Sequence, residues 1–206
     1  MAQPIDIILF DLGNVVVDFD SRRIVKEFAH RSGASPHDIA QLISTSTLYH
    51  DFEQGTVTPA ELHKALEHHL SFTIPYPEFL PIWNDIFSAK PDMEEFIRDM
   101  KTKCRIAALS NTNELHWNYL KEKFDIMNIF DDYFLSFQLH CRKPQEVIYS
   151  KVLDYYKVSP ETIAYIDDVP SFISVARNLG IQGHIFTTVD DVKQWISGRL
   201  QSDKHL

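Results

Sequence analysis

Cysteine is scarce in this chain of 206 residues, which contains only Cys104 and Cys141 and no Cys-x-x-Cys pair. Two cysteines cannot build a disulfide scaffold, and their spacing is not that of a zinc site, so we expect a reducing, cytoplasmic setting. Long apolar runs are also missing, since Ile7–Phe10 ends at once in Asp11 and no run approaches the roughly 18 residues of a membrane helix. The first residues lack the basic and apolar regions of a signal peptide. We therefore expect no membrane partner.

Positive charge is in deficit as well. The chain has 20 Lys and Arg residues against 29 Asp and Glu residues, a net charge of −9, and no basic run is longer than two residues. This balance disfavours nucleic acid as a partner and suits a metal cation or a metal–phosphate complex. With 44% hydrophobic and 24% charged residues, the composition is that of a folded globular protein. The oligomeric state stays open, and a monomer is compatible with the sequence.

Short apolar segments alternate with helical segments along most of the chain. The segments expected as strands are Ile5–Phe10, Arg105–Leu109, Tyr133–Leu135, Ile163–Ile166 and Ile181–Ile185. The helices expected between them are Asp92–Met100, Gln145–Tyr156 and Ser171–Leu179, each opened by a proline. Strands separated by helices predict a parallel sheet with helices on both faces. The fold class is therefore α/β, with a Rossmann-like core.

Residues 19–88 break this alternation. Helical patterns follow one another there, over Ser21–Arg31, Pro36–Ser44, Pro59–His69 and Pro77–Phe87, and Thr58 begins a capping box. A helical block inserted after the first strand predicts a cap over one edge of the sheet. We expect a core domain of residues 1–18 and 89–206 and a helical cap domain of residues 19–88.

Polar residues follow three of the predicted strands directly. Asp11 comes after the first strand, Ser110-Asn111 after the second, and Asp167-Asp168 after a third, while Arg142-Lys143-Pro144 lies in a connection. Open parallel sheets place ligands at the carboxyl ends of their strands. In this order, the four segments predict one active site.

The same four segments resemble the ordered motifs of the haloacid dehalogenase-like hydrolase superfamily. Phe10-Asp-Leu-Gly-Asn-Val-Val-Val-Asp18, Leu109-Ser-Asn-Thr-Asn113 and Arg142-Lys-Pro144 look most similar to the bacterial subgroup that includes α-D-glucose-1-phosphate phosphatase. The resemblance covers the whole chain, the helical cap included. It implies an enzyme, a phosphoric monoester hydrolase that acts on small phosphorylated metabolites through an aspartyl-phosphate intermediate.

The resemblance also implies a role for each acidic residue. Asp11 would attack phosphorus, and Mg²⁺ would be held by the Asp11 carboxylate, the Gly13 carbonyl and Asp168, with Asp167 assisting directly or through water. The adjacent carboxylates of Asp167 and Asp168 would repel each other in a buried site without a cation. This repulsion favours a metal site over a simple helix cap.

Two further segments would hold the phosphoryl group. By resemblance, Ser110 and the backbone amide of Asn111 bind phosphoryl oxygens. Lys143 precedes Pro144 at an expected helix N-terminus, where anions are favoured. By resemblance, its ammonium group binds both Asp11 and the phosphate.

Gly13 departs from the pattern. Phosphatases of this superfamily commonly carry a second Asp at that position, which protonates the leaving alcohol. Asp18, His50 and Glu53 are candidate replacements, and the sequence does not rank them. A sugar hemiacetal needs less protonation than a simple alcohol, which favours a hexose 1-phosphate as substrate.

Two alternative functions remain. Haloacid dehalogenases of the superfamily also lack the second Asp, but they need no metal and lack the acidic pair kept here at Asp167-Asp168. A pseudo-phosphatase that binds without turnover is the other alternative, because Gly13 cannot donate a proton. Phospho-accepting receiver domains use similar residues, but their acidic pair precedes the acceptor Asp in the chain.

Overall fold

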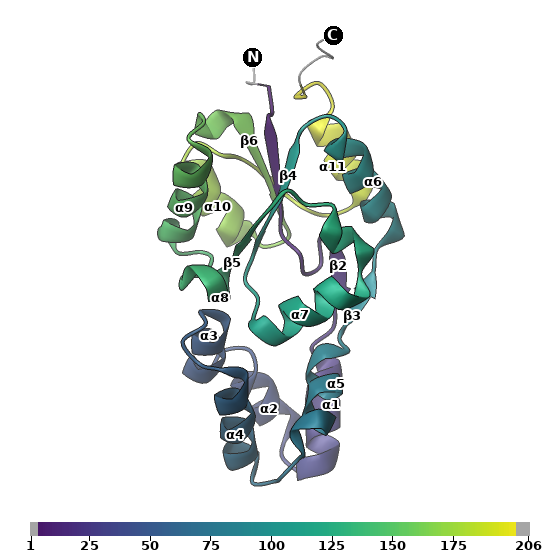
Figure 1. The fold of residues 1–206 in the computed structure, drawn as a ribbon, viewed down its shortest axis with the longest axis vertical. Helices are drawn as coiled ribbons and strands as arrows, with labels where there is room; N and C mark the ends of the chain where they lie inside the picture. The colour runs from purple at the N-terminus through teal and green to yellow at the C-terminus, as the bar shows by residue number, and fades with distance from the viewer. Residues whose placement is uncertain (1–3, 201–206) are drawn as a thin grey trace.

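The computed structural model describes residues 4–200 of the chain. A parallel sheet of five strands, in the order β5-β4-β1-β6-β7, forms its centre (Figure 1). The strands are β1 (Ile7–Phe10), β4 (Arg105–Ser110), β5 (Asp132–Leu135), β6 (Ile163–Asp167) and β7 (Gln182–Ile185). Each lies where the apolar pattern predicted it. The predicted α/β, Rossmann-like fold is confirmed.

β1 is the central strand, between β4 and β6. Phe10 lies opposite Ala108 of β4 and Ile166 of β6, and all four residues of β1 are buried. Side chains alternate between the two faces, so Ile8 and Phe10 join one hydrophobic cluster while Ile7 and Leu9 join the other. A strand buried on both faces has no polar side, which explains its uninterrupted apolar sequence.

Helices cover both faces of this sheet. α9 (Glu146–Tyr156) and α10 (Pro170–Asn178) cover one face, and α6 (Pro91–Lys101) and α11 (Val189–Ile196) the other (Figure 1). The remaining helices of this part are α7 (Glu114–Lys123), α8 (Ser136–Leu139), η1 (Asp125–Asn128) and η2 (Pro160–Thr162). Among the described residues, none of the helices has the length and apolar character needed to cross a membrane.

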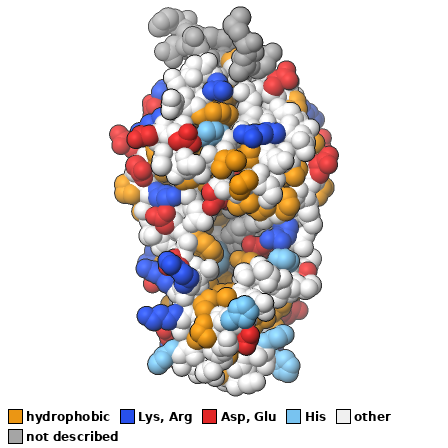
Figure 2. All heavy atoms as spheres, turned by 180° about the vertical axis from the view of Figure 1, so that it is seen from behind, with side chains coloured by type: hydrophobic (Ala, Val, Ile, Leu, Met, Phe, Trp, Pro, Cys, Tyr) orange, Lys and Arg blue, Asp and Glu red, His pale blue; other side chains and the backbone are white. Residues whose placement is uncertain are grey.

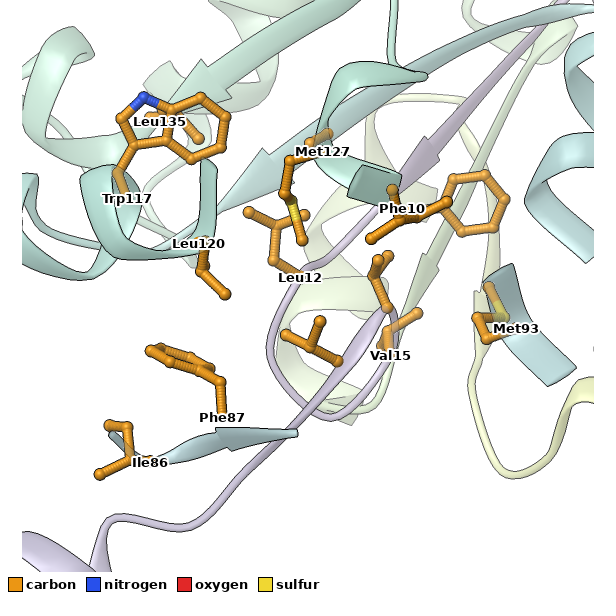
Figure 3. Packing of buried hydrophobic residues seen from close by; sticks show 14 of the residues in the cluster. Phe10, Leu12, Val15, Ile86, Phe87, Met93, Trp117, Leu120, Met127 and Leu135 are labelled. Atoms are coloured by element: carbon orange, nitrogen blue, oxygen red, sulfur yellow. The ribbon is translucent and has the colours of Figure 1, made fainter. Parts of the chain in front are cut away.

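The larger hydrophobic cluster continues from the sheet toward the helical block. Figure 3 shows Phe10 beside Met93 of α6 on one side, and Leu120 of α7 lying toward Phe87 on the other. The ring of Phe10 also makes an edge contact with Phe130, with ring centroids 6.3 Å apart. The apolar packing therefore runs without a break from β1 to the base of the helical block.

The block of residues 19–88 lies at the carboxyl-end edge of the sheet (Figure 1). Its helices are α1 (Arg22–Ser32), α2 (Pro36–Leu42), α3 (Thr47–Glu53), α4 (Pro59–Leu70) and α5 (Tyr76–Asn84). α3 was not predicted, because a helix of seven residues is too short for a clear periodic pattern. Several histidines gather on this end of the molecule in the view of Figure 2.

Two connections join the block to the sheet, and the sequence analysis missed their structure. β2 (Val17–Phe19) and β3 (Phe87–Ala89) pair antiparallel, with Phe19 opposite Phe87 and their rings 5.6 Å apart. The expected helix Pro77–Phe87 was therefore wrong at its end, because Phe87 lies in a strand. A three-residue strand carries too little alternation to be read from sequence. The boundaries proposed at residues 18 and 88 fall inside this ribbon, and the division into two domains stays a prediction.

Candidate active site

The three polar strand ends lie side by side in the structure. Asp11 follows β1, Ser110 ends β4 and Asp167 ends β6, and these are the three central strands. A cavity of about 270 Å³ opens at this edge. Its walls include the predicted site residues Asp11, Gly13, Ser110, Asn111 and Asp168. Lys143 and Asp167 lie behind these residues and are buried.

Asp11 is oriented by two donors. The backbone amide of Leu12 donates to Oδ1 at 2.8 Å, and the ammonium nitrogen of Lys143 lies 2.9 Å from the same oxygen. Burial raises the pKa of Asp11 to about 6, against the lowering effect of Lys143. The carboxylate is thus fixed at the cavity wall, and one of its oxygens is left for other partners.

Lys143 forms the ion pair with Asp11 that the resemblance implied, but its expected place at a helix N-terminus was wrong. α9 begins only at Glu146, and the Lys143 ammonium group turns away from that helix into the sheet edge. Its Nζ donates to Asp167 Oδ2 at 2.6 Å and to the Leu109 carbonyl at 3.0 Å, in addition to the ion pair with Asp11. Burial works against the charged form, but the two carboxylates raise the pKa of Lys143 above its ordinary value. The lysine therefore stays cationic.

The side chain of Asn111 holds the backbone of Lys143. Asn111 Nδ2 donates to the Lys143 carbonyl at 2.9 Å, and the Lys143 amide donates to Asn111 Oδ1 at 2.8 Å. This pair of hydrogen bonds joins the loop after β4 to the loop before α9. The Asn111 side chain is a positioning group, which leaves its backbone amide for the phosphoryl role expected by resemblance.

The acidic pair divides into a buried and a half-buried member. Asp167 Oδ1 accepts from the Val169 amide at 2.8 Å, and Oδ2 accepts from Lys143 and from the hydroxyl of Tyr165. Asp168 faces the cavity, and its Oδ2 accepts from Asn14 Nδ2 at 3.3 Å. Burial and the neighbouring Asp167 raise the pKa of Asp168. The protein itself supplies hydrogen bonds to both oxygens of Asp167 and leaves Asp168 more accessible.

The three carboxylates suit a divalent cation. One oxygen from each of Asp11, Asp167 and Asp168 lies within 4.8 Å of the others. When ionised, they carry three negative charges against the single positive charge of Lys143. Oxygen ligands and an excess of two negative charges are what Mg²⁺ requires. The residues therefore fit the predicted metal.

Gly13 lies in the cavity wall with free space around it. A Cβ built at Gly13 would meet only Phe19 Cβ, at 3.9 Å. Of the three candidate acids, Glu53 lines the cavity, whereas His50 and Asp18 are not part of its wall. Asp18 instead pairs with Lys90 at 3.2 Å. The geometry thus leaves Glu53 as the candidate in reach of a bound substrate.

Further cavity residues escaped the sequence analysis. They are Leu12, Asn14, Phe19, Tyr49, Phe87, Thr112, His116, Leu120, Val169 and Phe172. His116 is the most informative, because burial lowers its pKa to about 4 and it is therefore neutral at pH 7. Its Nε2 donates to the Trp83 carbonyl and its Nδ1 accepts from Asn113 Nδ2, both at 3.0 Å. No local motif marks this residue, since its main partner lies 33 positions away.

An Asp that can act as a nucleophile, a buried Lys and an acidic pair lie at neighbouring strand ends of a parallel sheet. This arrangement is typical of a hydrolase that transfers phosphoryl groups. The family model of haloacid dehalogenase-like hydrolases matches residues 5–180. The chain belongs to this family, as its motifs predicted. A curated relative is D-ribitol-5-phosphate phosphatase from Bacteroides thetaiotaomicron, 24% identical over 183 residues, which are 85% of this chain and 88% of that protein.

Solved structures share the fold. A HAD family enzyme from Bacteroides thetaiotaomicron, solved in complex with magnesium and inorganic phosphate, superimposes with a TM-score of 0.84 at 22% identity, covering 93% of this chain and 98% of that one. The L-2-haloacid dehalogenase from Xanthobacter autotrophicus, with chloropropionic acid covalently bound, gives a TM-score of 0.64 at 15% identity, covering 96% and 85%. The first is the nearer in shape.

Proposed function

We propose that this chain is a Mg²⁺-dependent phosphatase that hydrolyses small phosphorylated metabolites through an aspartyl-phosphate intermediate. The observation that carries the proposal is the cluster of Asp11, Lys143 and the acidic pair at one cavity. The name of the curated relative and the magnesium–phosphate complex of the similar structure support it. The sequence motifs support the same assignment residue by residue.

Asp11 performs the first step. Its carboxylate oxygen forms a bond to phosphorus while the bond from phosphorus to the ester oxygen breaks, and the departing alkoxide takes up a proton from water. Water then attacks phosphorus in the acyl phosphate, which releases inorganic phosphate and restores the Asp11 carboxylate. The Leu12 amide and Lys143 hold the side chain of Asp11 throughout.

The residues around Asp11 would balance the negative charge of the phosphoryl group. Asp11, the Gly13 carbonyl and Asp168 would hold Mg²⁺, with Asp167 assisting, and the metal would supply charge neutralisation between the carboxylate and the phosphate. Ser110 and the Asn111 amide donate to phosphoryl oxygens. Lys143 adds fixed positive charge, because Asp167 and the Leu109 carbonyl keep its ammonium group in place.

The finer proposal is a sugar phosphate, such as a hexose 1-phosphate. It rests on Gly13, where the acid that protonates a poor leaving group is missing, and on the lower proton demand of an anomeric oxygen. The substrate named for the curated relative, D-ribitol 5-phosphate, is also a phosphorylated sugar derivative, but its leaving group is a primary alcohol. We propose the cytoplasm as the setting, because the chain has only two cysteines and both are free.

The test is a screen of phosphorylated metabolites and of 2-haloacids, each with Mg²⁺ and with EDTA. We expect hydrolysis of phosphate esters that requires Mg²⁺ and no release of halide. Halide release that persists in EDTA would replace this function by haloacid dehalogenation. Tight phosphate-ester binding with no turnover on any ester would indicate the pseudo-phosphatase instead.

A further inference from the structure

A polar cluster at the boundary between the helical block and the sheet has no part in the mechanism above. It consists of Tyr49 and Glu53 of α3 and Arg142, the residue before Lys143. Glu53 is 6% exposed, and both it and Tyr49 line the cavity. Arg142 Nη2 lies 2.8 Å from Glu53 Oε2, and the Tyr49 hydroxyl interacts with the same carboxylate. Burying a carboxylate costs free energy unless the charge is paired or hydrogen-bonded, so its presence in a cavity indicates a role.

The backbone of Glu53 is tied to the phosphate-binding loop. The Ser136 hydroxyl lies 2.6 Å from the Glu53 carbonyl oxygen, and Ser136 Oγ accepts from the Thr112 amide at 3.0 Å. Thr112 directly follows Ser110-Asn111. Glu53 therefore has a fixed position relative to the proposed phosphate site. Glu53 comes from the helical block and the proposed phosphate site from the sheet edge, and both line the same cavity.

The Glu53 carboxylate can accept further hydrogen bonds. A carboxylate offers about four acceptor positions. Arg142 pairs with Oε2 without the alignment of a hydrogen bond, and Oε2 has no hydrogen-bond partner among the residues that the structure describes. Burial raises the pKa of Glu53, and the positive charge of Arg142 acts against that shift and favours the ionised carboxylate. The wall opposite the phosphate site thus offers a charged acceptor to a substrate hydroxyl.

Positive charge is absent from the wall of this cavity. None of its described lining residues is Lys or Arg, and the nearby cations are already paired, Lys143 with Asp11 and Asp167 and Arg142 with Glu53. His116 is neutral. A leaving group with a second negative charge would meet a carboxylate and no cationic partner, which is costly in a partly desolvated site. The remaining wall is largely aromatic and apolar, with Phe19, Phe87 and Phe172 available to the C–H faces of a carbon chain.

We propose that Glu53 is a specificity-determining residue: it accepts a hydrogen bond from a hydroxyl of the leaving group, and it excludes leaving groups that carry a carboxylate or a second phosphate. The substrates are then monophosphates of neutral polyhydroxylated compounds. This inference rests on the proposed phosphatase function, and its test must be separable from a test of that function.

The test uses matched esters of one chain length. D-ribitol 5-phosphate and 5-phospho-D-ribonate share the reacting end and differ in a terminal hydroxymethyl group or carboxylate. 1,5-Pentanediol monophosphate keeps the length and the terminal hydroxyl but loses those between. We expect kcat/KM for the ribitol ester to exceed that for each of the other two by about 10- to 100-fold, the scale of one hydrogen bond to a charged group.

Glu53→Gln keeps the volume of the side chain and removes its charge. We expect the ratio between the ribitol and ribonate esters to fall to within about threefold in this variant, because the repulsion is gone. Asp51→Asn is the matched control, since Asp51 lies on the same helix and is not part of the cavity wall. It should keep the wild-type ratios. Thermal unfolding of both variants shows that each is folded before the ratios are compared.

Three outcomes distinguish a failure of the proposed role of Glu53 from a failure of the proposed phosphatase function. Equal kcat/KM for all three esters, with Mg²⁺-dependent hydrolysis of p-nitrophenyl phosphate intact, would overturn the role of Glu53 and leave the phosphatase function standing. A wild-type ratio that persists in folded Glu53→Gln would overturn it equally. Absence of hydrolysis on every ester, p-nitrophenyl phosphate included, would overturn the proposed function itself.

Discussion

The edge of the sheet and the helical block that faces it build opposite walls of one cavity by different means. At the sheet edge, Asp11 and Asp168 follow buried strands, so their places are set by the backbone of β1 and β6. In the helical block, Glu53 depends on contacts with Arg142 and Ser136, which come from elsewhere in the chain. On the proposed function, backbone positions of the sheet place the reacting groups, whereas the residue proposed to select the substrate depends on side-chain contacts between distant segments.

The largest expected effect on activity comes from removing the proposed nucleophile at the sheet edge. Asp11→Asn keeps the volume and loses the attacking charge, so we expect kcat to fall at least about 1,000-fold, as for other essential nucleophiles. The measurement is Mg²⁺-dependent hydrolysis of p-nitrophenyl phosphate by folded protein. Retention of more than a few per cent of wild-type turnover would contradict the assignment of Asp11.

Substitutions in the acidic pair test whether Asp167 and Asp168 have different roles at the sheet edge. Asp168→Ala removes the accessible carboxylate, so we expect the Mg²⁺ concentration for half-maximal activity to rise at least about tenfold, as for other losses at a metal site. Asp167→Ala removes the partner of Lys143 at 2.6 Å, so we expect a fall in kcat that saturating Mg²⁺ does not restore. The measurement is a Mg²⁺ titration of both variants. Identical titration curves would show that the two aspartates do not differ in role.

A substitution at Gly13 tests whether the sheet edge lacks a general acid for the leaving group. Wild type should hydrolyse a hexose 1-phosphate faster than the matching 6-phosphate, and Gly13→Asp should narrow that gap, since general acids contribute about 10²–10⁴ in rate. The space around Gly13 accommodates a Cβ. The measurement is kcat/KM for both isomers on both proteins. Equal rates in wild type would show that another group already supplies the proton or that binding outweighs chemistry.

The last expected effect is on stability and lies on the other side of the comparison, in the contact of His116 with the helical block. Its folded pKa of about 4 lies below its ordinary value of 6.5. Between these two pH values only the unfolded chain takes up the proton, so the stability that neutral His116 confers is complete above pH 6.5 and declines as the pH falls toward 4. The difference in unfolding free energy between wild type and His116→Gln should therefore shrink by about 2–3 kcal/mol from pH 7.5 to 4.5. Denaturant titrations at both pH values measure it. A constant difference would contradict a buried neutral histidine.

The sheet and the motif residues were predictable from the sequence for a physical reason. Buried parallel strands are uninterrupted apolar runs, and their ends are marked by abrupt polar residues such as Asp11 and Ser110. The resemblance implied the contact of Lys143 with Asp11, but its contacts with Asp167 and the Leu109 carbonyl were not predicted, because these partners come from two other strands. His116 was not predicted, because its partner Trp83 is distant in sequence. Glu53 was named as a candidate acid, but its contacts with Arg142 and Ser136 were not predicted, because both partners are distant in sequence.

Covalent phosphorylation of Asp11 is the step on which the proposed function depends. The direct measurement is acid quenching of wild type and Asp11→Asn during turnover with Mg²⁺, followed by mass spectrometry of the peptide that contains residue 11. The account predicts a single phosphoryl group on Asp11 of wild type, formed and lost at rates that support turnover, and none on the variant. Release of the alcohol in the first turnover without a phosphorylated Asp11 at any quench time, or a phosphoryl group on another residue, would contradict it.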